Sequence, residues 1–266
     1  MTRALLFVCL TTAVAQSDKL AFEEAAIKPV APGEQCQQSM IGPMPGGGLR
    51  VECLPLKSIV TWAYEIQNYQ ITGGPAWMES LRWNILATAP HPTDSAVPFE
   101  YEQMTDAQRQ NTMQTLRARA RTLLADRFQL TLRRELREQT VYGLTIAKGG
   151  PKLAESADQA KSGFMRRGRG VIESRGAGLD LLAQYLGIDL QRPVINRTGL
   201  TAHYDFKLEF TPERTVSRDS PEPISASDSS GATLFTAIQE QLGLKLDSTK
   251  APVEMFIVQG AEKPEN

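Results

Sequence analysis

Apolar residues near the C-terminal end of the chain recur at helical spacing and are followed by two short apolar stretches. Leucine and isoleucine lie one helical turn apart from 234 to 242, and Gly243 stands where a helix would end. Leu244–Leu246 and Val253–Val258 predict two strands that turn at Pro252. This part of the chain therefore predicts a unit of helix, strand, turn and strand.

The same order of elements is predicted three more times upstream, twice with an additional leading strand. The predicted helices lie near 55–65, 112–127, 178–191 and 233–242. The predicted strands lie at 49–53, 69–71, 81–88, 128–132, 141–147, 171–173, 193–195 and 204–210. The helix near 112–127 also carries arginines that predict a solvated face.

These patterns predict an α+β fold. We expect duplicated strand-helix-strand-strand and helix-strand-strand units, with mostly antiparallel sheets and helices packed on one face, because no single unit of this kind buries its own sheet. The predicted domains are a first half at 16–150, a linker at 151–169 and a second half at 170–266. The second half includes a flexible insertion at 211–232, which is rich in Ser, Pro and acidic residues.

Residues 1–15 have the features of a secretory signal peptide. Arg3 provides a positive charge, 4–10 is an apolar run too short to span a membrane, and Ala13–Ala15 supplies small residues before Gln16. A buried N-terminal strand or helix is the alternative. The mature chain contains no predicted transmembrane segment, so we expect an exported protein that is periplasmic or secreted.

Charge and composition limit the classes of partner that the chain can bind. Removal of the leader, with Arg3, leaves 28 Lys and Arg residues against 30 Asp and Glu residues, a formal charge of −2. Because this balance provides no basic surface field, no nucleic-acid partner is predicted. An apolar content of 41% is sufficient for substantial cores.

Two cysteines remain in the predicted mature chain. Cys9 leaves with the leader, and Cys36 and Cys53 form an even pair in an oxidising compartment. A disulfide between them would close a loop rich in Gly and Pro, which is worth about 3 kcal/mol in the chain-entropy description. Two unpaired thiols, with Cys53 packed in a strand, are the alternative.

No catalytic, metal or cofactor signature is present. The two histidines, His91 and His203, lie far apart in the sequence, and no nucleophile elbow, phosphate loop or dinucleotide fingerprint occurs. His203 and Asp205 share a strand face, but this spacing does not produce the hydrogen bond of a catalytic dyad. We therefore predict no catalytic residue, no metal ligand and no cofactor.

One loop combines a tight turn with a large aromatic side chain. It consists of Gly73, Gly74 and Pro75, followed by Trp77. Trp77 is a candidate for stacking on a ligand, and the alternative is that its ring caps the core. These four residues are the predicted binding residues.

Several phrases of the chain together resemble one family. They include 71–77 (ITGGPAW), 124–128 (LADRF), 147–153 (AKGGPKL), 192–200 (RPVINRTGL) and 235–246 (FTAIQEQLGLKL). The chain resembles the uncharacterised soil-associated protein family expanded in acidobacteria, over nearly its whole mature length. The family has no established activity or catalytic residues to transfer to this chain.

The resemblance implies export and a sensory or binding role by association, since some relatives carry the domain behind a membrane metallopeptidase of the antibiotic-sensor type. Asn196 and Gln259 stand where the family pattern has acidic residues. The leading hypothesis is a non-enzymatic ligand- or protein-binding module of the cell envelope, with an envelope protein or an extracellular ligand as partner. The alternatives are an unrecognised extracytoplasmic hydrolase and a structural component of an envelope complex.

Overall fold

The structure is a computed structural model that describes residues 20–90, 104–157, 164–168, 170–211 and 232–264. The predicted leader, nearly all of the predicted insertion and part of the predicted linker lie outside these residues. Packing divides the chain into two compact units. The first comprises Met1–Ile66, Gly73–Arg133 and Val258–Asn266, and the second comprises Gln67–Thr72 and Arg134–Ile257.

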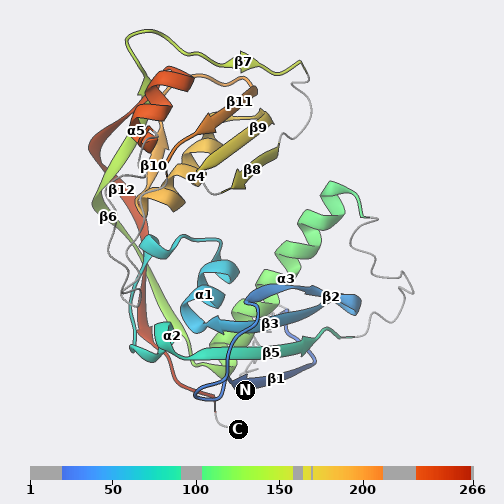
Figure 1. Cartoon of the computed structure of the whole chain (residues 1–266). Helices are drawn as coiled ribbons and strands as arrows, with labels where there is room; N and C mark the ends of the chain where they lie inside the picture. The colour runs from blue at the N-terminus through green and yellow to red at the C-terminus, as the bar shows by residue number, and fades with distance from the viewer. Residues whose placement is uncertain (1–19, 91–103, 158–163, 169, 212–231, 265–266) are drawn as a thin grey trace, which may run out of the picture. The chain divides into compact units, whose positions relative to one another are not determined.

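Sheet A belongs to the first unit and contains four antiparallel strands in the order β1-β5-β3-β2 (Figure 1). The strands are β1 (Glu24–Pro29), β5 (Arg82–Thr88), β3 (Gly48–Pro55) and β2 (Met40–Met44). In β5, Trp83, Ile85 and Ala87 are buried, and the residues between them are not. This period-two pattern gives sheet A one core face and one outer face.

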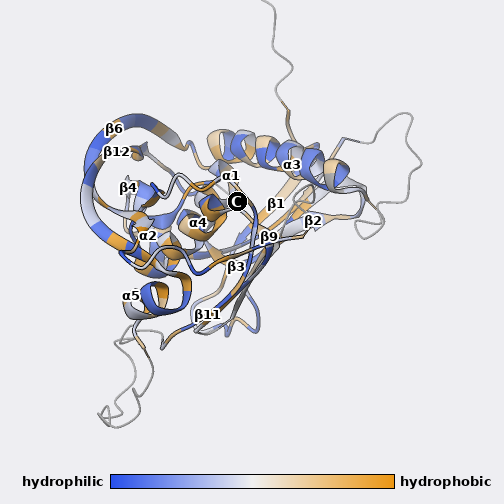
Figure 2. Cartoon of the chain, turned by 90° about the horizontal axis from the view of Figure 1, so that it is seen from above, coloured by the Kyte–Doolittle hydropathy of each residue, from blue (hydrophilic) through white to orange (hydrophobic). Residues whose placement is uncertain are grey.

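The described part of the first unit contains the α-helices α1 (Leu56–Tyr64), α2 (Trp77–Ser80) and α3 (Asp106–Arg127). α1 begins after Pro55, whose fixed φ suits a helix start, and it ends at Glu65 in a left-handed conformation. Thr105 and Gln108 form a capping box at the start of α3. Figure 2 shows hydrophilic and hydrophobic residues alternating along α3, whose apolar stripe is buried.

The arginines of α3 are solvated in part, because those at 109, 117, 119 and 121 are half-buried. Arg117 is half-buried, pairs with Glu65 and lies over the ring of Trp62, 5.6 Å from the centroid. Arg121 lies over the ring of Tyr64 at 5.8 Å. Long guanidinium side chains also cover apolar surface and stack on aromatic rings, which sequence spacing alone does not show.

Sheet C belongs to the second unit and contains four antiparallel strands in the order β7-β11-β9-β8. The strands are β7 (Ala154–Glu155), β11 (Tyr204–Glu209), β9 (Val171–Ala177) and β8 (Phe164–Gly168). The helix α4 (Leu179–Leu190) follows β9, and α5 (Leu234–Ala237) continues directly into a π-helical turn at Ile238–Leu242.

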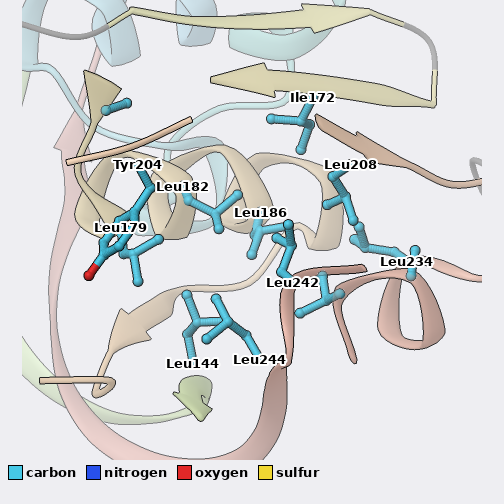
Figure 3. Packing of buried hydrophobic residues seen from close by; sticks show 13 residues of the cluster. Leu144, Ile172, Leu179, Leu182, Leu186, Tyr204, Leu208, Leu234, Leu242 and Leu244 are labelled. Atoms are coloured by element: carbon cyan, nitrogen blue, oxygen red, sulfur yellow. The ribbon is translucent and has the colours of Figure 1, made fainter. Parts of the chain in front are cut away.

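The core of the second unit forms around α4 (Figure 3). The leucines of α4 lie between two layers of side chains. Ile172 and Leu208 come from sheet C. Leu144 comes from β6 (Thr131–Ile146) and Leu244 from β12 (Leu244–Gly260), and all four residues are completely buried. Apolar residues of α5 and its π-helical turn complete the cluster. The helical spacing at 179, 182 and 186 therefore marks a real core face.

Sheet B has the strand order β10-β6-β12-β4. The strands are β10 (Val194–Asn196), β6 (Thr131–Ile146), β12 (Leu244–Gly260) and β4 (Ile71–Gly73). β10 runs parallel to β6, whereas β6 and β12 run antiparallel, since their contacts occur in opposite order along the two strands. Each of the two long strands replaces a predicted pair of strands, so those predicted turns were wrong.

The position of Pro252 is compatible with a strand β12 that continues without a turn. Residues two apart in a strand direct their backbone groups to the same side, so the Pro252 nitrogen faces the same side as the Glu254 carbonyl. That carbonyl accepts a hydrogen bond from the Gln70 side chain, with a donor to acceptor distance of 3.3 Å. Gln70 precedes β4, so this side of β12 lies beside the start of a three-residue strand, where a proline nitrogen costs the ladder little.

Sheets A and C have the same topology, and the predicted α+β class is confirmed. β1, β5, β3 and β2 of sheet A correspond to β7, β11, β9 and β8 of sheet C. α1 follows β3 as α4 follows β9, and each helix ends at a residue with positive φ, Glu65 or Gln191. This is the pattern that a duplication produces, while the predicted domain boundaries stay a prediction.

Candidate functional site

An open depression of about 730 Å³ lies on the outer face of sheet A. Its floor comes from β1, β3 and β5, and its wall comes from the loop between β1 and β2. This volume lies within the range of small-molecule sites. Its lining includes Ala26, Lys28, Glu34, Arg50, Glu52, Asn84 and Leu86.

Strand register arranges the floor in two rows. Ala26 of β1 and Arg50 of β3 both lie opposite Leu86 of β5, which forms the first row. Lys28 of β1 lies opposite Asn84 of β5, which starts the second row. Leu86 is 49% exposed, although strand residues on the other face of sheet A are buried. The floor therefore combines an apolar row, Ala26 and Leu86, at whose end Arg50 lies, with a polar row, Lys28 and Asn84.

A β-bulge at Cys53 connects the floor to the wall. The β3 register shifts between Val51 and Leu54, and Cys53 has a positive φ of 53°. The backbone N–H of Cys53 donates to the Asn84 side-chain oxygen at 2.9 Å, and its carbonyl accepts from Arg82 at 2.9 Å. These bonds replace the ladder bonds that the bulge removes.

The same cysteine is placed to hold the wall of the depression. The structure brings the sulfur atoms of Cys36 and Cys53 together, with the two Cα atoms 6.0 Å apart. This separation lies within the usual range for a disulfide. Cys36 lies in the loop between β1 and β2, so a bond at this position ties the wall to the floor. The predicted bridge in the exported protein stays a prediction.

Sheet C contains the same bulge without the cysteine. The β9 and β11 register shifts between Tyr204 and Phe206, and Gly176 has a positive φ of 67°. Its N–H donates to the Asp205 carboxylate at 2.6 Å. Gly176 precedes α4 by three residues, as Cys53 precedes α1 by three. The bulge therefore belongs to both sheets, whereas the cysteine at this position occurs only in sheet A.

The charged side chains at the centre of the floor neutralise each other. Arg50 donates through two of its nitrogens to one oxygen of Glu52, and Gln38 donates to the other oxygen at 2.7 Å. The hydrogen bond from Arg50 is the largest cause that lowers the pKa of Glu52 below its usual value. Glu52 is thus ionised at neutral pH, and the carboxylate has its partners within the protein.

The predicted loop at Gly73 and Gly74 is a tightly packed turn. Both glycines have positive φ, 80° and 83°. A Cβ atom on Gly74 would lie 2.7 Å from the Met78 sulfur and 2.9 Å from a methyl group of Val258. The Pro75 carbonyl accepts the Met78 N–H at 3.0 Å. The glycines and the proline are therefore explained by packing and turn geometry, and their role in binding stays a prediction.

Trp77 lies at the outer end of a chain of aromatic rings. Its half-buried ring meets Trp83 edge-on, with 6.2 Å between centroids, and Trp83 meets Phe128 at 5.1 Å. Trp83 is 2% exposed and Phe128 is completely buried. The ammonium group of Lys263 lies 6.0 Å from the Trp77 centroid. Trp77 therefore contacts the core with one edge, and it does not line the depression on sheet A.

Other candidate chemistry has structural roles where the structure describes it. The Asp205 carboxylate accepts the Gly176 N–H of the bulge, as the amide of Asn84 does in sheet A. His91 lies outside the described residues. Within the described part of the chain, no three His, Cys, Asp or Glu side chains are grouped to hold a metal ion. No helix in that part is long and apolar enough to cross a membrane.

Two of the sequence segments that resemble the soil-associated family, 147–153 and 235–246, pack against each other. A Cβ on Gly243 would lie 2.1 Å from the Gly150 carbonyl oxygen, so this close approach requires glycine. Lys152 donates its backbone N–H to Leu242 at 2.8 Å and its ammonium group to the Glu240 carbonyl at 2.8 Å. These bonds satisfy carbonyls at the end of the π-helical turn. The two segments therefore have a structural role at this contact.

Sequence reasoning did not find Lys28, Asn84 and Leu86 as site residues. Each is one polar or apolar residue in a short strand, and only the strand register brings them to one face. The available signal was the break in apolar and polar alternation after Cys53, because such a break is typical of a β-bulge.

The comparisons with known proteins identify a family whose function is unknown. Residues 57–261 match the family described as Protein of unknown function (DUF3738). No curated protein and no solved structure matches the chain. Because the family match covers well over half of the 266 residues, this chain belongs to the DUF3738 family.

Proposed function

We propose that this chain is an exported, non-enzymatic binding module of the cell envelope, and that the depression on sheet A is its ligand site. The observation that carries the proposal is the comparison of Cys53 with Gly176. Both residues have positive φ at the same bulge, but one is a cysteine whose sulfur meets the wall of the depression.

Backbone strain supports a specific role for Cys53. Glycine adopts positive φ without cost, whereas a residue with a Cβ atom loses about 1 kcal/mol or more in this region. Strained residues of this kind persist where the surroundings determine them, and they are concentrated at functional sites. Gly176 shows that the bulge itself needs only a glycine. The cysteine therefore holds the wall loop through Cys36, and this loop forms one side of the depression.

Export provides the setting for this site. The proposed leader at 1–15 places the mature chain in an oxidising compartment, where a disulfide between Cys36 and Cys53 is stable. The resemblance to the soil-associated family supports the same location, as does the sensory or binding role of its relatives by association. The ligand or partner of such a module would come from the envelope or from the extracellular medium.

Native mass spectrometry of protein isolated from the envelope of its source organism tests the proposal. We expect a small bound species that is released on denaturation and is absent from Leu86→Lys, which introduces a charge into the floor. Leu136→Lys is the matched control, because Leu136 is 74% exposed and does not line the depression. Equal retention in both variants would contradict the site. Conversion of the bound species to a new mass would support the hydrolase alternative.

A further inference from the structure

We propose that the depression on sheet A binds a carboxylate that carries a short aliphatic group. This inference rests on the proposed function and names the class of its ligand. The polar row of the floor supplies the contacts to the carboxylate, and the apolar row supplies the contact surface for the aliphatic group.

The polar row presents hydrogen-bond donors that the protein leaves unused. Asn84 accepts the Cys53 N–H through its side-chain oxygen, which directs the amide NH₂ group away from the bulge. Among the residues that the structure describes, this NH₂ group has no acceptor. Lys28 lies directly opposite Asn84 in the neighbouring strand and is exposed. Two donors, one of them cationic, therefore point from adjacent strands into the depression.

Among the described residues, Lys28 is the cation of the lining that is available to an anion, while the Glu34 carboxylate on the wall opposes anion binding. Arg50 and Glu52 neutralise each other. Glu34 accepts the backbone N–H of Ala31 at 3.2 Å. Lys28 has no ion-pair partner among the described residues. An ammonium group beside an amide donor matches a carboxylate, which accepts several hydrogen bonds and forms its strongest ones with charged donors.

The apolar row determines the rest of the ligand. Ala26 and Leu86 lie opposite each other, and each is two residues along its strand from Lys28 or Asn84. Residues two apart in a strand are separated by about 7 Å. A ligand with a carboxylate at the donors and a branched aliphatic group within about 7 Å would contact both rows. A peptide that ends in leucine carries a carboxylate and a branched aliphatic group within this distance.

NMR titration of the mature chain with acetyl-Ala-Ala-Leu tests the inference against its C-terminal amide, which differs only in the carboxylate. We expect shifts at Lys28, Asn84 and Leu86 with the acid, and binding about tenfold weaker or more for the amide. Lys28→Gln should reduce acid binding to the level of the amide. Lys57→Gln removes the same charge from α1, outside the depression, and should leave binding unchanged.

The outcomes separate this inference from the proposed function. Equal binding of acid and amide, or equal effects of the two lysine variants, would overturn the carboxylate assignment. Absence of peptide binding would also overturn it, whereas the native ligand test at Leu86 would still decide whether the depression is a site. Glu34→Gln provides a second check, because removal of a negative charge from the wall should strengthen acid binding and leave amide binding unchanged.

Discussion

Cys53 in β3 and Gly176 in β9 occupy the same position in two sheets of the same topology. Their φ angles are 53° and 67°, and each donates its N–H to an Asn or Asp side chain in the neighbouring strand. The bulge is therefore an element of the repeated architecture. Because a glycine is sufficient for the bulge in sheet C, the cysteine in sheet A has a further structural role, which is to bring its sulfur atom to Cys36 in the wall loop.

Gly176→Ala tests the requirement for positive φ at the bulge. We expect the free energy of unfolding to fall by about 1–2 kcal/mol, since alanine is strained in this conformation. Gly149→Ala is the control, because Gly149 lacks positive φ and a Cβ atom there would have open space. Denaturant unfolding measures both variants. Equal stability of the two variants would show that the bulge of sheet C relaxes without its glycine.

Asp205 should act as a hydrogen-bond acceptor and not as a catalytic carboxylate. Asp205→Asn keeps an acceptor for the Gly176 N–H, as Asn84 does in sheet A, so we expect a change in stability below about 1 kcal/mol. Asp205→Ala removes the acceptor and should cost about 1–3 kcal/mol. Thermal denaturation of both variants distinguishes the roles. A larger loss for Asn than for Ala would contradict the bulge interpretation.

Trp77→Ala measures how much its ring contributes to folding. Because the ring is half-buried and meets Trp83 edge-on, we expect a loss of about 2–3 kcal/mol, which lowers Tm by roughly 4–12 °C. Trp77→Phe keeps an aromatic edge at this position and should lose less. If Tm stays unchanged in Trp77→Ala, the ring is free for a ligand, and the predicted binding role of the Gly73 loop gains support.

Intact-mass measurement of the exported protein tests its proposed processing. We expect a chain that begins at Gln16, because Ala13–Ala15 provides the small residues of a cleavage site. We also expect no reaction with an alkylating reagent until Cys36 and Cys53 are reduced. A different first residue would contradict the cleavage site. Uptake of two alkyl groups without reduction would contradict the bridge.

Local sequence patterns predicted the helices well because helix spacing and end signals are local. α1 and α4 were predicted at 55–65 and 178–191 and occur at Leu56–Tyr64 and Leu179–Leu190. The long strands were predicted wrongly, since polar residues in β6 and Pro252 in β12 resemble turns when the pairing is unknown. Strand pairing is a long-range property that periodicity does not contain.

The candidate site was missed for the same reason. Lys28, Asn84 and Leu86 are distant or unremarkable in sequence, and only the register of β1 and β5 places them on one face. Gly74 and Trp77 were prominent in sequence, yet their contacts with Val258 and Trp83 are sufficient to explain them. Tight turns and aromatic rings serve packing as well as binding, so sequence prominence does not distinguish these roles.

Methyl-detected NMR compares the two most informative leucines in one experiment. The mature protein is titrated with the low-molecular-mass fraction of the envelope from its source organism. We expect the Leu86 methyl signals to shift, because Leu86 lies in the floor of the depression, and the Leu136 signals to stay, although Leu136 is more exposed at 74%. Unchanged Leu86 signals, or equal shifts at both residues, would contradict a ligand site on sheet A.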